Sequence, residues 1–268
     1  MATHDEVLEI AIGERRIDAT LIVPDARMPG VLFLHGWGGN QAQYANRARE
    51  IAALGCACLT VDMRGHAKTE ADHATVTRED NLRDALAAYD RLVRERAVDR
   101  GRIAVVGSSY GGYLATILTT LRPVRWLALR APALYKDADW DAPKLALREM
   151  QGLDAWRREA LEVRDNRALG AAAAYAGDVL IVESANDIIV PAAVIENYRN
   201  AFSRGRSLTY RVLDGADHAL TDPACRQAYT TILVNWITEM IAGTRADDAA
   251  SRKRSQEAMK AQAAARAD

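Results

Sequence analysis

A serine flanked by glycines, between a predicted strand and a predicted helix, constrains this chain more than any other feature. Residues 102–107 are an apolar, β-branched run ending at Gly107, and an Ala/Leu/Thr-rich helical pattern begins at Gly111. This Gly-x-Ser-x-Gly context is typical of a sharp strand-to-helix turn that exposes a nucleophile, because glycine tolerates the close approach of neighbouring backbone. We therefore predict that Ser109, and not Ser108, is a nucleophile. The alternative is an ordinary serine in a tight turn.

Composition favours one enzyme-sized domain. The chain has 268 residues, of which 49% are hydrophobic, so it can bury a large core. Its net charge of −1 gives no reason to expect nucleic acid or an anionic membrane as partner. Cys56 and Cys58 share one face of a predicted strand and are interpreted as small core residues, not as part of a disulfide framework. Without a signal sequence or an apolar run of bilayer length, the chain is expected to be cytoplasmic.

Strand and helix patterns alternate after an opening hairpin. Strands are predicted at residues 6–12, 16–23, 31–34, 57–61, 102–107, 124–130, 179–182 and 208–212. Helices are predicted at residues 41–54, 78–97, 111–121, 191–203 and 224–242. The alternation predicts an α/β fold with a mostly parallel sheet of about eight strands and helices on both faces. In such sheets, ligands bind beyond the carboxyl ends of the strands.

Two segments depart from this rhythm. Residues 132–176 lack a clear strand and are predicted to form a small helical cap over the site, although a pair of ordinary surface helices is the alternative. The cap side chains expected at the substrate pocket are Trp140, Leu145 and Met150. Residues 244–268 are Ala-rich and charged without an apolar stripe, and are predicted to be a polar helical or disordered tail. The domain proper is therefore expected to span residues 1–243.

A serine nucleophile needs a base and a group that orients the base. His218 follows the last predicted strand, at the sheet edge where Ser109 should lie, and is the candidate base. Asp187 follows the preceding strand and gives the chain order Ser, Asp, His, so it is the candidate orienting acid. Asp217 is a rival, but adjacent side chains rarely point at each other. Three further aspartates are not presented cleanly by a strand end: Asp137, Asp139 and Asp141.

The glycine-rich run His35-Gly36-Trp37-Gly38-Gly39 directly follows a predicted buried strand. It could turn the N–H of Trp37 towards the site, where it and the N–H of Tyr110 would form an oxyanion hole. The alternative is a glycine-rich loop that only turns. His35 is expected to lie at the substrate pocket. The sequence has no metal-ligand cluster, dinucleotide fingerprint or phosphate loop, so we expect neither a cofactor nor a metal.

Five ordered segments together resemble the α/β-hydrolase superfamily. They are His35–Gly39, Asp62–His66, Gly107–Gly112, Asp187–Pro191 and Asp217–His218. The resemblance covers residues 6–242. It implies an α/β-hydrolase fold and acyl transfer to water through an acyl-serine, with the residues named above in their predicted roles.

The segment from Val98 to Tyr113 is similar to dienelactone-hydrolase-like esterases and to prolyl-oligopeptidase-type catalytic domains. Dienelactone hydrolases proper use a cysteine nucleophile, and Ser109 argues against that activity. The family's Asp-x-Arg-Gly-His-Gly segment is present except that Ala67 replaces its last glycine; His66 in this segment is expected to support the fold.

Three functions are compatible with these residues. The first is a carboxylesterase acting on small or medium-sized soluble esters, as a monomer or homodimer. The second is a serine peptidase of the oligopeptidase type, which lacks here the β-propeller that usually gates those enzymes. The third is a non-catalytic ligand-binding protein on the same fold, because fold alone does not select the function.

Overall fold

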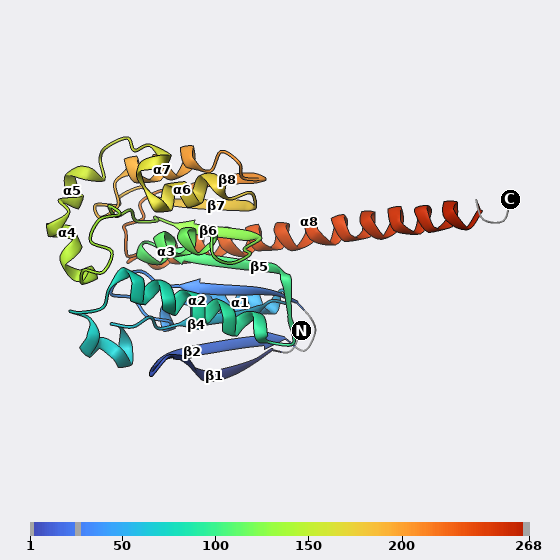
Figure 1. The fold of residues 1–268 in the computed structure, drawn as a ribbon, viewed down its shortest axis with the longest axis horizontal. Coiled ribbons are helices and arrows are strands. Elements are labelled where there is room, and N and C mark those ends of the chain that lie inside the picture. Colours follow the sequence, from blue (N-terminus) through green and yellow to red (C-terminus); the bar gives the residue numbers. More distant parts are fainter. Residues whose placement is uncertain (1–2, 25–27, 265–268) are drawn as a thin grey trace.

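Eight strands form one sheet in the computed structural model, which describes residues 3–24 and 28–264 (Figure 1). Their order across the sheet is β1-β2-β4-β3-β5-β6-β7-β8. The strands are β1 (Thr3–Ile12), β2 (Arg15–Pro24), β3 (Met28–Leu34), β4 (Ala57–Val61), β5 (Val98–Ser108), β6 (Trp126–Arg130), β7 (Asp178–Ser184) and β8 (Ser207–Leu213). The pairs β1/β2 and β2/β4 are antiparallel, and the other five pairs are parallel. The predicted mostly parallel α/β sheet is confirmed.

Helices cover both faces of the sheet. The helices are α1 (Ala42–Ala53), α2 (Arg78–Arg94), α3 (Tyr110–Leu118), α4 (Leu147–Met150), α5 (Leu153–Trp156), α6 (Arg167–Ala174), α7 (Ala192–Ala201) and α8 (Pro223–Ala264), with short 3-10 turns at Ala67–Asp72, Lys144–Ala146 and Val163–Asp165. The alternating pleat of β3 divides the core between the two faces. Leu32 and Leu34 pack with α2, α3, α6 and α7, whereas Val31 and Phe33 pack with α1 and α8. Because both faces of this parallel strand are buried, its sequence is one continuous run of apolar residues.

The segment of residues 132–176 contains α4, α5 and α6 rather than one separate helical pair. Helix α6 packs against α3 and α7 and so belongs to the layer that covers the sheet. Leu147 of α4 and Leu153 of α5 are buried in the same core. The segment is thus anchored to the domain by its own apolar side chains.

Helix α8 is longer than the helix predicted at residues 224–242 and extends away from the sheet (Figure 1). The predicted tail at residues 244–268 begins within α8, and residues 265–268 lie outside the described part of the chain. No helix within the described residues is both long and apolar enough to cross a membrane.

The turn from β5 into α3 is pressed against the end of β3. A Cβ atom added at Gly111 would lie 2.2 Å from the carbonyl oxygen of Leu34, and one added at Gly107 would lie 2.5 Å from the carbonyl oxygen of Gly111. Both neighbours are backbone atoms of buried elements, which cannot give way cheaply. Glycine at these two positions is therefore a steric requirement of the turn.

We expect Gly111→Ala to lower the free energy of unfolding by about 3 kcal/mol, because the new methyl group overlaps backbone of β3. Gly170→Ala in α6 is the matched control, since its Cβ would lie 3.7 Å from the nearest atom, the carbonyl oxygen of Val163. That control should be neutral or slightly stabilising, because alanine is the better helix former. Urea unfolding of both variants measures the difference, and equal stability of Gly111→Ala and the parent would contradict the steric argument.

Candidate active site

Three side chains from three loops form one hydrogen-bonded row at the carboxyl edge of the sheet. Ser109 follows β5, Asp187 follows β7 and His218 follows β8. The hydroxyl of Ser109 lies 2.9 Å from Nε2 of His218, and Nδ1 of His218 lies 2.6 Å from Oδ2 of Asp187. Their strands are parallel, so the residues after them meet at the same edge. In this geometry the imidazole can accept the serine proton at Nε2 while Nδ1–H donates to the carboxylate.

The carboxylate of Asp187 is held by more than the histidine. Its Oδ1 accepts hydrogen bonds from the backbone N–H groups of Ile189 and Val190, both at 2.8 Å. Burial raises the pKa of Asp187, but the bonds from His218 and these two N–H groups outweigh burial and leave the pKa lowered. The rival Asp217 instead accepts bonds from the backbone N–H and hydroxyl of Thr221, at 2.8 and 2.7 Å. The structure therefore brings Asp187, and not Asp217, to the histidine.

The backbone of Ser109 is strained. Its φ is 52° and its ψ is −116°, a region that residues with a Cβ seldom occupy. The conformation is secured by three backbone bonds: Ser109 N–H donates to Arg130 O at 2.9 Å, and Ser109 O accepts from the N–H groups of Tyr113 and Ala133 at 3.1 and 3.0 Å. Such strain at a half-buried serine that borders a cleft is typical of a nucleophile elbow.

The glycine-rich loop after β3 lies directly against Ser109. A Cβ added at Gly36 would be 3.3 Å from Cβ and 3.9 Å from Oγ of Ser109. Trp37 is the next residue of this loop, and Tyr110 is the first residue of α3, whose N–H has no acceptor within the helix. Trp37 lines the cleft that contains Ser109, and Tyr110 directly follows Ser109 in the chain, so their role as oxyanion donors stays a prediction.

Two neutral histidines shape this loop. Nδ1–H of His35 donates to Gly36 O at 2.8 Å, and its Nε2 accepts from the N–H of Met63 at 3.0 Å. His66 Nε2 accepts from the N–H of Gly38 at 3.1 Å. Burial is the main cause that lowers the pKa of both rings to about 4. The expectation that His35 lies at the substrate pocket is wrong, because its ring is fully buried. Both ring nitrogens form hydrogen bonds that connect the loop to the residues after β4.

The predicted cap side chains are not at the site. Leu145 and Met150 are 52% and 57% exposed. Trp140 packs beside α2, where its Nε1–H donates to Glu79 at 2.7 Å. The cap side is instead closed by Lys144, whose ammonium lies 4.2 Å from the ring centroid of Trp37. The prediction that Trp140, Leu145 and Met150 line the pocket is therefore corrected.

A cleft of about 430 Å³ opens beside Ser109 and His218 on the other side, towards α1 and the start of α8. Its lining includes three arginines that the sequence reasoning did not single out: Arg47, Arg130 and Arg226. Arg47 could have been noticed in the sequence, because a charged residue is unusual on the apolar face of a helix, and it lies on that face of α1 between buried Tyr44 and Ile51. Arg130 could also have been noticed, because it is the charged last residue of an apolar strand. Arg226 is exposed in the first turn of α8, and nothing in the sequence distinguishes it from other surface arginines.

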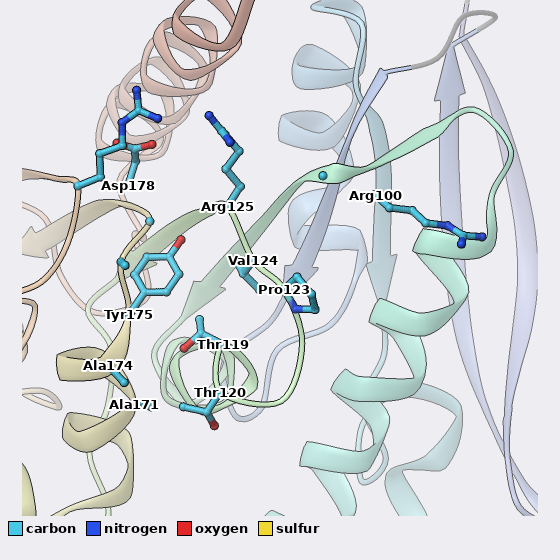
Figure 2. Close-up of a pocket in the computed structure, with 14 residues that line it drawn as sticks. Arg100, Thr119, Thr120, Pro123, Val124, Arg125, Ala171, Ala174, Tyr175 and Asp178 are labelled. Atoms are coloured by element: carbon cyan, nitrogen blue, oxygen red, sulfur yellow. The ribbon is translucent and has the colours of Figure 1, made fainter. Parts of the chain in front are cut away.

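Two larger hollows lie away from the hydrogen-bonded row. One, of about 650 Å³, is lined by residues at the amino ends of β5 to β8, such as Arg125 and Asp178, together with the ends of α3 and α6 (Figure 2). The other, of about 680 Å³, lies beside α6 and its preceding turn. Neither hollow is lined by Ser109, Asp187 or His218. The candidate site is therefore identified by these hydrogen-bonded residues and not by the volume of the hollow. Within the described residues, no group of three or more His, Cys, Asp or Glu side chains could hold a metal ion.

The sheet order, the strained turn at Ser109 and the fold comparisons define the chain as an α/β hydrolase. The family described as serine aminopeptidase, S33, matches residues 27–169, which is more than half of the chain. The chain belongs to this family.

Comparison with individual proteins gives distant relatives. An uncharacterised protein of Mycobacterium tuberculosis is 29% identical over 192 residues, which cover 71% of this chain and 63% of that protein, less than two thirds of its length. A dienelactone hydrolase from Anabaena variabilis superposes with a TM-score of 0.64 at 17% identity, covering 88% of this chain and 98% of that one. An acylaminoacyl peptidase from Pyrococcus horikoshii gives 0.65 at 16% identity, covering 88% and 41%. At these identities the two structures show the shared fold.

The neutral His35 predicts acid sensitivity. A histidine in the unfolded chain binds its proton near pH 6.5, whereas folded His35 stays neutral until about pH 4, so acidification between these values favours the unfolded state. We expect the free energy of unfolding to fall by about 2 kcal/mol between pH 7 and pH 5 on account of His35 alone. His66 acts in the same direction.

Urea unfolding at the two pH values measures this loss. The control is His35→Gln, because the glutamine amide can donate and accept hydrogen bonds but does not titrate. The free energy of unfolding of this variant should fall less between pH 7 and pH 5, by the amount assigned to His35. An equal pH dependence in parent and variant would contradict the assignment.

Proposed function

We propose that this chain is a serine hydrolase that cleaves carboxylic ester bonds of small or medium-sized substrates through an acyl-serine intermediate. The observation that carries the proposal is the continuous row from the hydroxyl of Ser109 through His218 to Asp187, with separations of 2.9 and 2.6 Å. Membership of a hydrolase family and the α/β-hydrolase fold support the same class of reaction.

In the proposed first step, Oγ of Ser109 attacks the ester carbonyl carbon and its proton passes to Nε2 of His218. The imidazolium that forms is stabilised by Asp187, whose side chain is only 4% exposed and accepts Nδ1–H at 2.6 Å. The lowered pKa of Asp187 keeps the carboxylate ionised for this task. Because Ser109 is already turned outward by its backbone, attack requires no rearrangement of the turn.

The carbonyl oxygen becomes an oxyanion during the attack. In the proposal, the backbone N–H groups of Trp37 and Tyr110 donate to it, one from the loop after β3 and one from the start of α3. A single donor of this kind contributes about 3 kcal/mol to stabilisation of the transition state. The histidine bonds that hold Gly36 and Gly38 keep the loop donor aimed before the substrate arrives.

The second half of the reaction reuses the same groups. The imidazolium of His218 gives its proton to the leaving alkoxide, which departs as the alcohol. Water then donates a proton to Nε2 as its oxygen attacks the acyl carbon, and collapse of the tetrahedral intermediate returns the proton to Ser109 and frees the acid.

A serine peptidase is the second candidate, because the matched family is described as serine aminopeptidase and one similar fold is an acylaminoacyl peptidase. The same row of residues serves amide and ester cleavage, and the amine leaving group takes its proton from His218. Comparing p-nitrophenyl acetate and butyrate with aminoacyl-p-nitroanilides separates the candidates. Higher kcat/KM on the anilides would favour the peptidase over the esterase.

We expect a fluorophosphonate probe to modify one residue, Ser109. Peptide mass spectrometry of the labelled protein should place the adduct there, and the same protein should hydrolyse p-nitrophenyl butyrate. Ser109→Ala should lose both labelling and hydrolysis while keeping the parent's melting temperature. An adduct on another residue, or none, would refute the nucleophile assignment.

We expect Asp187→Asn to lower kcat by about three to four orders of magnitude, because the amide favours the wrong tautomer of His218. Asp217→Asn is the matched control, since its carboxylate accepts hydrogen bonds from Thr221 in its own turn, whereas that of Asp187 accepts one from His218. It should retain kcat close to that of the parent. Steady-state kinetics on one p-nitrophenyl ester compares the two, and the reverse ranking would show that Asp187 is not the orienting acid.

A further inference from the structure

The cleft beside Ser109 carries an unusual charge. Arg47, Arg130 and Arg226 line it, and none of its described lining residues is an aspartate or glutamate. The chain as a whole has a net charge of −1, so this concentration of positive charge is local. A cleft with one sign of charge raises the local concentration of ligands with the opposite sign.

Arg47 is a buried cation that has no counter-ion among the described residues. Arg47 lies on α1, and the residue is only 9% exposed. Nε donates to the hydroxyl of Thr230 at 3.0 Å, Nη1 donates to Gln43 O at 3.0 Å, and the guanidinium lies 4.9 Å from the ring centroid of Tyr229. Within the described part of the chain, Arg47 forms no ion pair and its Nη2 has no hydrogen-bond acceptor. Burial of an unpaired charge is costly, and an anionic ligand would offset that cost.

Thr230 links the side chain of Arg47 to the backbone of Arg226, and both arginines line the cleft. The hydroxyl of Thr230 accepts from Nε of Arg47 and donates to the backbone carbonyl of Arg226 at 2.9 Å. Nη1 of Arg226 donates to the carbonyls of Leu220 and Thr221, both at 2.7 Å. Among the residues described, no carboxylate pairs with Arg226, and its Nε and Nη2 have no acceptor. Those two nitrogens form the edge of the guanidinium that suits a carboxylate.

Two further lining residues support an anionic occupant. Arg130 is 7% exposed and its nitrogens are occupied by Ser108, Ser184 and the carbonyl of His218, so it contributes positive potential rather than a contact. The hydroxyl of Tyr229 is buried and has no hydrogen-bond partner within the described residues. A buried hydroxyl without a partner is uncommon in a folded protein, and here it borders the cleft.

We propose that this cleft binds a carboxylate group of the substrate, so that the esters hydrolysed at Ser109 are carboxylate-bearing ones, such as half-esters of dicarboxylic acids. This substrate class rests on the esterase function proposed above. Arg47 and Arg226 contact the carboxylate, and Ser109 attacks the ester carbonyl at the other end of the molecule. A neutral acyl chain in the same place would leave both cations unpaired.

The test compares two esters of equal chain length that release the same chromophore, mono-p-nitrophenyl glutarate and methyl p-nitrophenyl glutarate. We expect the parent to prefer the free acid in kcat/KM by about 10- to 100-fold, the range that hydrogen bonds to a charged group support. Arg226→Gln should reduce this ratio towards one, and so should added salt. Arg226 is exposed, so its replacement should not impair folding.

The matched control is Arg49→Gln on the same helix α1. Arg49 points outward to Asn46 and Asp5 and does not line the cleft. It should keep the parent's ratio. A parent ratio near one, or a ratio that falls equally in both variants, would overturn the carboxylate site. A third ester, p-nitrophenyl 4-phosphonobutyrate, tests a phosphate-like group, and its preference over the glutarate would also overturn the assignment to carboxylate.

A binding measurement separates this inference from the esterase proposal. Calorimetry on Ser109→Ala should show binding of monomethyl glutarate, and Ser109→Ala with Arg226→Gln should bind it at least about tenfold more weakly. If neither p-nitrophenyl ester is hydrolysed but this difference remains, the esterase proposal fails and the anion site stands. If both esters are hydrolysed equally and monomethyl glutarate does not bind, the anion site fails and the esterase proposal stands.

Discussion

The arrangement of the whole site depends on how closely the start of α3 approaches the end of β3. The missing side chain at Gly111 leaves room for the carbonyl of Leu34, which a Cβ would meet at 2.2 Å. This approach brings the strained Ser109 and the loop at Gly36 into contact, with 3.3 Å between a Cβ placed at Gly36 and that of Ser109. Because β3 and β5 are neighbouring buried strands, the nucleophile and the loop that faces it share one rigid support.

Polar groups beneath this contact hold the loop in one shape. His35 and His66 are neutral and bond to backbone groups on both sides of the glycines. The adjoining Arg64 is itself fixed by a buried ion pair with Asp84 at 2.7 Å. A buried ion pair contributes little net stability, but losing one partner is costly, so it selects a single geometry. The shape of the loop is therefore held by groups that do not line the cleft beside Ser109.

The two sides of the nucleophile differ. On one side, the segment of residues 132–176 presses Lys144 onto the ring of Trp37 and fills the space with aromatic side chains. On the other side, α1 and α8 leave a cleft that ends in arginines. The open side of Ser109 is therefore bordered by α1 and the start of α8, and not by the segment between β6 and β7.

The sequence by itself determined the sheet, the strained turn and the order of the three polar loops, because these depend on local patterns. A glycine-flanked serine after an apolar run defines the turn, and residues after parallel strands must meet at one edge. The candidates Ser109, Asp187 and His218 could therefore be named in advance. The position of the glycine-rich loop followed from the same rule, since its glycines come directly after β3.

Only the tertiary structure decided which side chains line the cleft beside Ser109. His35 is adjacent to the loop in sequence, yet its ring points down to Met63 and is fully buried. The apolar side chains of residues 132–176 carry no periodicity that tells core from pocket, and Leu145 and Met150 face solvent instead. Arg47 and Arg226 line the same cleft, and Arg47 bonds Thr230, which is 183 residues away in the chain. Their convergence depends on the packing of α1 against α8, which no local pattern encodes because side-chain direction across two helices is set by how they pack.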